Sequence, residues 1–335
     1  MGRTAWVIPV KRWEDECLAG LGAALEARAG ETCVLVDAQL AAEIPQVARQ
    51  WVADGKAMIV RGFGALGAND ALDMAARLAR AETVLVLDTA TGEEVAWQPA
   101  GDAASPEVSV LVPMYQAGAY ANEAIASVYE QIRRPSELVV VDDGSEDDSA
   151  RHACEALGGC PDWLRAVLVL APHRGQAAAR NAALACSSGE WVFYLDADDV
   201  LEPTALGSLL GAAEANPSAG LVCACCQDFI SPDLTPEEAA RLKINPQPYR
   251  RMLSGCTITR KAIYDAVGPY DETLPSSETA QWMLRMKDAG VEVLDINDVT
   301  LRRRYHRNNF GRRDRKTQLA SYMAIIKQRR GKRAE

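Results

Sequence analysis

Three carboxylates at the end of an apolar run are the clearest chemical feature of the sequence. Asp196, Asp198 and Asp199 follow the run Trp191–Leu195 almost without interruption. Neighbouring carboxylates repel one another unless a cation offsets their charge, and divalent cations take carboxylate oxygens together with the phosphates of a substrate. The segment therefore predicts a divalent metal ion, held by Asp196 and Asp198, that carries a phosphate-bearing ligand. A solvated turn or a helix cap is the alternative for an acidic segment of this length.

A second acidic pair follows another apolar run. Asp142 and Asp143 come after Val139–Val141, and Gly144 behind them suits a tight turn. The alternative role of these carboxylates is to cap a helix that begins near Ser149. If the two apolar runs are neighbouring parallel strands, their carboxyl ends border one polar crevice.

A cationic segment lies between the two acidic ones. It begins with His173, Arg174 and Gly175, continues with the small residues 177–179, and ends with Arg180 and Asn181. Small side chains let a ligand approach the backbone closely, and a guanidinium group offers a rigid fork of donors to phosphate. The segment therefore complements the two acidic ones in a site for a phosphate-bearing ligand.

Apolar runs alternate with helix-like segments around these motifs. Near-continuous apolar strands that alternate with helices predict a mostly parallel sheet covered by helices on both faces, with its ligands beyond the carboxyl ends of the strands. The expected strands are Val108–Val112, Leu138–Val141, Ala166–Leu170, Trp191–Leu195, Leu221–Cys226 and Val291–Ile296, and the expected helices are Tyr120–Gln131, Gln176–Ala185, Pro203–Glu214 and Glu278–Ala289.

The first hundred residues resemble a degenerate copy of the same pattern. Pro9 and Asp37 are separated by 28 residues, and Pro113 and Asp142 by 29. The region predicts an α/β N-terminal domain over residues 1–93, and coincidence between two α/β patterns is the alternative. The proline-bearing, small-residue segment 94–107 is the expected linker, followed by the main domain at 108–315 and a basic helix or tail at 316–335.

Composition and charge exclude several classes of protein. The 335 residues are 48% hydrophobic and 24% charged, which is typical of a globular protein. The chain shows neither a membrane-spanning run nor a signal-peptide core, which predicts a cytoplasmic protein. The nine cysteines predict reduced thiols, and Cys223–Cys226 is expected to be a buried strand because it lacks the partners of a zinc site.

The net charge of −10 is unevenly distributed. Residues 301–335 carry a net charge of +11, and the remaining 300 residues carry −21. An acidic body argues against general nucleic-acid binding. The basic end faces either an anionic ligand or membrane surface, as peripheral contact, or solvent.

Four motifs in order resemble a known family. They are Pro113-Met114-Tyr115-Gln116, Val141–Ser145, Arg174-Gly175 with Ala179-Arg180-Asn181, and Leu195–Asp199. Together they resemble family-two inverting glycosyltransferases of the GT-A fold, over about residues 107–312. The resemblance implies a Rossmann-like α/β fold and a nucleotide-sugar donor, with a UDP-sugar expected. It implies Mn²⁺ or Mg²⁺ as cofactor and leaves open a saccharide, lipid-linked or protein acceptor.

The resemblance also implies roles for single residues. Pro113, Tyr115 and Asp142 would form the nucleobase pocket, with Asp143 nearby. Arg180 would face the nucleotide, with Arg174 as a further contact. Asp196 would face the ribose or the metal, and Asp198 would bind the metal that bridges the diphosphate. Gln116 stands where the family usually has asparagine.

The acceptor side departs from the family pattern. An inverting transfer needs a carboxylate that takes the proton of the acceptor. Thr279 stands where the family has its usual aspartate, which leaves Glu278 as the candidate catalytic base. The alternative for Glu278 is a residue at a helix N-terminus that the helix dipole favours.

A segment near residue 305 completes the resemblance. Arg304-Tyr305-His306-Arg307-Asn308-Asn309 resembles an Arg-x-His-x-x-Asn segment of many relatives. This resemblance implies that His306 completes the metal site or contacts the diphosphate, with Arg304 and Arg307 as candidate phosphate contacts. A lone histidine with a structural role is the alternative. The expected function is a metal-dependent glycosyltransferase. The competing functions are a catalytically impaired nucleotide-sugar-binding protein and, less favoured, a nucleotidyltransferase.

Overall fold

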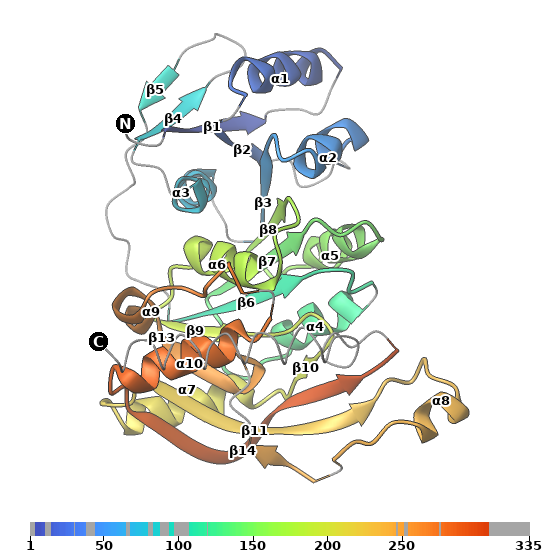
Figure 1. Cartoon of the computed structure of the whole chain (residues 1–335), viewed down its shortest axis with the longest axis vertical. Helices are drawn as coiled ribbons and strands as arrows, with labels where there is room; N and C mark the ends of the chain where they lie inside the picture. Colours follow the sequence, from blue (N-terminus) through green and yellow to red (C-terminus); the bar gives the residue numbers. More distant parts are fainter. Residues whose placement is uncertain are drawn as a thin grey trace.

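One 14-stranded sheet runs through the described part of the protein (Figure 1). The computed structural model describes residues 4–10, 15–29, 31–37, 44–64, 68–79, 83–87, 94–96, 107–118, 120–245, 247–250, 254–274 and 276–307. The strand order is β10-β14-β11-β13-β9-β6-β7-β8-β3-β2-β1-β4-β5, with β12 paired to β11. The predicted α/β class and its mostly parallel centre are confirmed.

The parallel centre consists of the strands that the apolar runs predicted. They are β6 (Val108–Met114), β7 (Glu137–Asp143), β8 (Arg165–Ala171) and β9 (Trp191–Tyr194), in the spatial order β9-β6-β7-β8. Their carboxyl ends lie at the same edge of the sheet because the strands are parallel. One predicted acidic segment ends β7 and the other follows β9, so this edge brings them together.

Beyond β9 the sheet is mixed. The strand β13 (Thr257–Arg260), absent from the sequence prediction, pairs antiparallel with both β9 and β11. The strand predicted at Val291–Ile296 is β14 (Val293–Tyr305), which is much longer and includes the arginine run. The remaining strands are β10 (Val200–Leu201), β11 (Leu221–Ile230), which contains the predicted run Cys223–Cys226, and β12 (Tyr249–Arg250).

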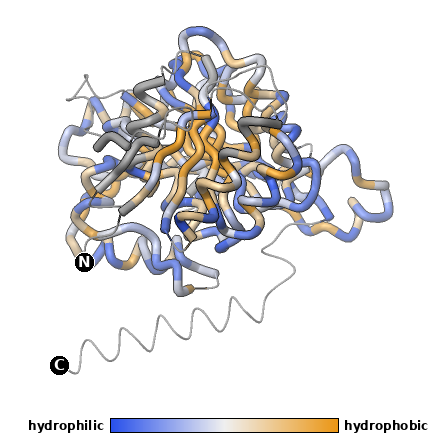
Figure 2. Tube along the Cα trace, turned by 90° about the horizontal axis from the view of Figure 1, so that it is seen from above, coloured by the Kyte–Doolittle hydropathy of each residue, from blue (hydrophilic) through white to orange (hydrophobic). Residues whose placement is uncertain are grey.

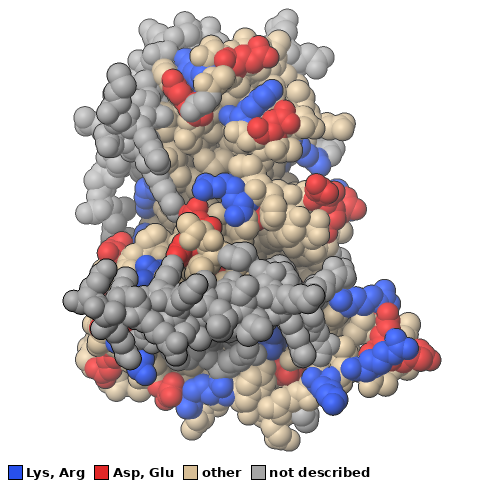
Figure 3. Space-filling view, in the orientation of Figure 1, with Lys and Arg blue, Asp and Glu red and all other residues tan. Residues whose placement is uncertain are grey.

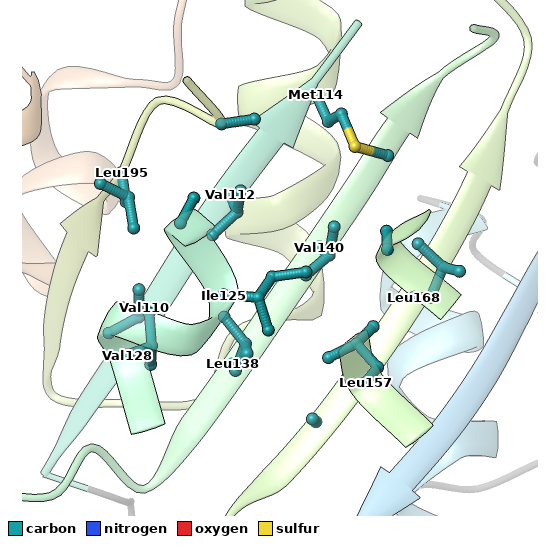
Figure 4. Close-up of a cluster of buried hydrophobic side chains, with 14 of the residues drawn as sticks. Val110, Val112, Met114, Ile125, Val128, Leu138, Val140, Leu157, Leu168 and Leu195 are labelled. Atoms are coloured by element: carbon teal, nitrogen blue, oxygen red, sulfur yellow. The ribbon is translucent and has the colours of Figure 1, made fainter. Parts of the chain in front are cut away.

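Helices cover both faces because alternate strand residues point to opposite sides. Val110, Val112, Leu138 and Val140 pack with Ile125 and other apolar residues on one face (Figure 4). The intervening residues of β6 and β7 pack on the other face against α6, in a hydrophobic cluster that also includes residues of α10. Figure 2 shows the hydrophobic residues concentrated along the strands at the centre. The helices of this half are α4 (Tyr120–Tyr129), α5 (Ser149–Gly158), α6 (Gln176–Cys186), α7 (Ala205–Ala215), α8 (Pro236–Ala240), α9 (Lys261–Val267) and α10 (Glu278–Asp288), with the 3₁₀ turn η1 (Ser254–Cys256).

The N-terminal half of the sheet, β1 to β5, repeats the strand order found in the main half, β6 to β14. It contains β1 (Thr4–Val10), β2 (Thr32–Asp37), β3 (Met58–Gly64), β4 (Thr83–Leu87) and β5 (Glu94–Ala96), with helices α1 (Asp15–Ala27), α2 (Gln46–Ala53) and α3 (Ala68–Ala79). The order β3-β2-β1-β4-β5 corresponds to β8-β7-β6-β9-β13, including the final antiparallel strand. The two halves meet where β3 pairs antiparallel with β8.

The strand register supports equivalent positions in the two halves. Pro9 pairs with Val36 and Pro113 pairs with Val141, so Asp37 and Asp142 occupy the same place one residue further along. In the N-terminal half, Arg61 of β3 forms a fully buried ion pair with Asp37. A degenerate copy remains a prediction, which this register favours.

Several sequence predictions concern residues outside the described ranges. They include most of the expected linker 94–107 and the basic tail 316–335. Within the described residues, no helix combines the length and apolar character that crossing a membrane requires.

Candidate donor and metal site

The acidic loop after β9 is braced by a buried arginine. The carboxylate of Asp199 accepts a hydrogen bond of 2.8 Å from the backbone N–H of Arg304 in β14. Burial, followed by the charges of Asp198 and Asp196, raises the pKa of Asp199 well above its usual value. The Arg304 side chain is buried and donates to the Asp198 carbonyl at 2.8 Å and to Glu123 of α4 at 2.6 Å. Arg304 therefore holds the loop in place in this structure and does not point toward solvent as a phosphate contact.

Asp198 and His306 lie side by side. His306 Nε2 is 2.9 Å from Asp198 Oδ2, and the imidazole packs against the ring of Tyr120 at 4.6 Å between centroids. A carboxylate oxygen and an imidazole nitrogen suit a divalent ion such as Mn²⁺, which substrate phosphates would coordinate as well. Among the described residues, no three His, Cys, Asp or Glu side chains are grouped to hold a metal by themselves. The pair therefore fits a metal site that the ligand completes.

Asp196 is held by Arg180 on the other side of the loop. The Arg180 Nη2 atom donates to Asp196 Oδ1 at 3.0 Å, and its Nη1 atom contacts Glu278 and Thr279 of α10. Arg180 and Glu278 are each 3% exposed. Ser277, which directly precedes α10, adopts a left-handed φ of 66°. A buried, ion-paired Glu278 is positioned to hold Arg180, and its role as catalytic base remains a prediction.

The second acidic pair lies beside an exposed aromatic ring. Pro113 is buried in β6, and Tyr115 at the end of this strand is 44% exposed. Asp142 is buried, and burial raises its pKa to about 6. Two hydrogen bonds from Ser145 oppose this rise. Asp143 accepts hydrogen bonds of 2.9 Å from the backbone N–H groups of Arg174 and Gly175, which join the loops after β7 and β8.

The two remaining predicted arginines point outward. Arg174 is exposed and forms an ion pair of 2.8 Å with Glu272, and Arg307 forms a bidentate pair with Glu238 of α8. Figure 3 shows acidic and basic side chains next to one another around α8. Arg174 and Glu272 line both a cavity of about 380 Å³ between the two halves and one of about 140 Å³ that Glu278 also lines.

The structure adds residues that sequence reasoning missed. His173 stacks on Tyr115 with ring centroids 4.2 Å apart, although the sequence placed it only at the start of the cationic segment. Glu123 lies on the helix predicted at Tyr120–Gln131, and the sequence gives no signal for its contact with Arg304. The contact joins residues 181 positions apart, which only the fold can bring together.

Part of the chain is similar to known glycosyltransferases. Residues 109–264 match the model of glycosyl transferase family 2. The chain is 33% identical over 116 residues to an uncharacterized glycosyltransferase from Nostoc, which covers 35% of each chain. It is 39% identical over 108 residues to the succinoglycan biosynthesis protein ExoU of Rhizobium meliloti, which covers 32% of this chain and 31% of the relative. The chain thus spans about a third of the length of these two relatives.

Two solved structures show a similar arrangement at low sequence identity. Residues 1–349 of S. aureus TarS, in complex with UDP-GlcNAc, have a TM-score of 0.48 and 19% identity, and the match covers 61% of this chain and 60% of that fragment. The mannosyltransferase PcManGT from Pyrobaculum calidifontis, in complex with GDP-Man and Mn²⁺, has a TM-score of 0.46 and 20% identity. That match covers 62% of this chain and 59% of the mannosyltransferase.

Proposed function

We propose that the protein, whose residues 109–264 match the model of glycosyl transferase family 2, transfers a sugar from a nucleotide-sugar donor to an acceptor hydroxyl. The observation that carries the proposal is the shared sheet edge. At this edge Tyr115 follows β6, Asp142 lies near the end of the neighbouring strand β7, and Asp196 and Asp198 follow β9. The proposed donor is a UDP-sugar, and the acceptor is a saccharide, a lipid-linked glycan or a protein.

The proposed reaction inverts the anomeric centre. The acceptor oxygen forms a bond to the anomeric carbon as the bond between this carbon and the diphosphate oxygen breaks, and a carboxylate takes the acceptor proton. Glu278 is the proposed proton acceptor. Asp198 and His306 are the proposed metal ligands, and the ion would supply charge neutralisation for the departing diphosphate.

Arg180 has a distinct part in this site. Its buried guanidinium carries positive charge next to the acidic loop and fixes the orientation of Asp196 through their hydrogen bond. Preorganised charge of this kind stabilises a developing negative charge without reorganisation during the reaction. Arg180 thus belongs to the proposed donor site both as an electrostatic and as a positioning residue.

A donor panel tests the proposal. Purified protein is mixed with UDP- and GDP-sugars, Mn²⁺ and candidate acceptors, and release of the nucleoside diphosphate is measured. We expect release with one donor, its loss on chelation of the metal, and its loss in Asp198→Ala. Release that persists in full with the chelator present would refute the metal role.

A second candidate function follows from the environment of Glu278. Because Glu278 is buried and ion-paired and Thr279 replaces the family's aspartate, a nucleotide-sugar-binding protein without transferase activity is the alternative. Calorimetry separates the two functions, since the alternative predicts binding of UDP with no turnover of any donor that binds.

A further inference from the structure

The imidazole of His173 covers the exposed ring of Tyr115. The two ring centroids are 4.2 Å apart, and the ring planes differ by 20°, so the rings are stacked face to face. Tyr115 follows β6, and His173 lies in the loop between β8 and α6. The stacked pair therefore joins two loops at the carboxyl edge of the parallel strands, beside the acidic pair after β7.

The same imidazole forms a hydrogen bond with Asp143. His173 Nδ1 lies 2.8 Å from Asp143 Oδ2 and 3.0 Å from the Asp143 carbonyl oxygen. Because the carbonyl oxygen and an ionised carboxylate only accept hydrogen bonds, Nδ1 carries the hydrogen. The ring thus presents a flat face to a tyrosine and an N–H group to a carboxylate.

The backbone holds His173 close while leaving its side chain accessible. Gly144 has a φ of 69°, and a Cβ at this position would lie 2.7 Å from the backbone nitrogen of His173. Glycine is required for this approach of the two loops. The His173 side chain is nevertheless 52% exposed. The backbone of His173 is therefore held at the site, while its imidazole stays exposed and is not packed in the core.

A nucleobase bound at this place would need the same two contacts. It would stack on Tyr115, the exposed aromatic ring of the donor site, and direct a ring N–H group toward the acidic pair. We propose that His173 competes with the donor nucleobase for the face of Tyr115 and for Asp143, so that nucleotide binding displaces the imidazole. This inference rests on the proposed function, and it makes His173 a residue that sets donor affinity.

Calorimetry with UDP and Mn²⁺ on the full chain tests the competition. His173→Ala removes both contacts that the nucleotide must otherwise break, so we expect UDP to bind about threefold to tenfold more tightly than to the wild type. His173→Asn keeps a hydrogen-bond donor for Asp143 but loses the stacked ring, so its affinity is expected between the two. His152→Ala removes an imidazole on α5 outside this site and is the matched control, with unchanged affinity.

The outcomes separate the inference from the proposed function. Unchanged or weaker binding of UDP by His173→Ala, with the wild type binding UDP, overturns the competition and leaves the donor site standing. Failure of the wild type and of every variant to bind UDP or GDP overturns both. Thermal unfolding of each variant shows whether it is folded, and the Asn variant still tests stacking if the Ala variant is not.

Discussion

The buried ion pair between Arg180 and Glu278 leads to a prediction for both stability and rate. Arg180 and Glu278 are each 3% exposed, and Arg180 keeps a second carboxylate partner in Asp196. Loss of one partner of a buried pair typically costs about 3–5 kcal/mol. Glu278→Gln keeps an acceptor oxygen, and Asp196 still compensates part of the charge, so we expect a loss of about 1–3 kcal/mol.

Two assays separate the roles of Glu278. Chemical denaturation of the full chain measures the free energy of unfolding, and release of the nucleoside diphosphate measures kcat. If Glu278 accepts the acceptor proton, Glu278→Gln lowers kcat by about 10²–10⁴-fold with little change in UDP affinity. If Glu278 only positions Arg180, the variant changes UDP affinity together with stability, and kcat falls much less.

A surface ion pair provides the control. Glu214 pairs with Arg133 but is exposed, so Glu214→Gln is expected to leave stability and rate unchanged. A Glu278→Gln protein as stable as the wild type to within about 0.5 kcal/mol would refute the buried pair as a stabilising contact.

Four further predictions follow from local geometry. Burial raises the pKa of Asp142 to about 6 from a usual 3.8, so the folded state binds this proton more tightly than the unfolded state does. The free energy of unfolding therefore falls by roughly 2–4 kcal/mol as pH rises from about 4 to 6, and denaturation of Asp142→Asn across that range is expected to lack this fall. Gly144→Ala brings a Cβ within 2.7 Å of the His173 backbone at a left-handed φ, and we expect the free energy of unfolding, measured by denaturation, to fall by about 1–3 kcal/mol. Gln116 adopts a φ of 49°, which asparagine accepts more readily, so Gln116→Asn is expected to raise the free energy of unfolding by about 0.5 kcal/mol. Asp198→Asn is expected to weaken the response of UDP affinity to Mn²⁺, as calorimetry with and without the ion would show, and an undiminished response would contradict its role as ligand.

The parallel centre of the fold was predictable because its strands are buried on both faces. Such strands are near-continuous apolar runs, which is why β6, β7, β8 and β9 were found at nearly their observed bounds. The strand β13 was missed because its four residues, two of them threonines, give too short a pattern, and its place between β9 and β11 depends on antiparallel pairing with distant segments. The length of β14 was missed because its arginines resemble a solvated segment, although Arg304 is buried.

The site residues divide in the same way. Asp142, Asp143, Asp196 and Asp198 were predictable because acidic residues after buried strands lie at one sheet edge. Their partners were not, since the contact of Arg180 with Glu278 spans 98 residues and that of Asp198 with His306 spans 108. The sequence contained both members of each pair, but only the resemblance to a family suggested a common site.

The sequence by itself therefore determined the elements and the chemistry available at the strand ends. Apolar periodicity and the carboxylates after each run are local properties, readable over a few residues. The tertiary structure decided which charges are paired: Glu278 holds a buried arginine, Arg304 braces the acidic loop, and His173 lies on Tyr115. The reason is physical, because burial and the approach of a counter-charge depend on packing between segments that are far apart in the chain.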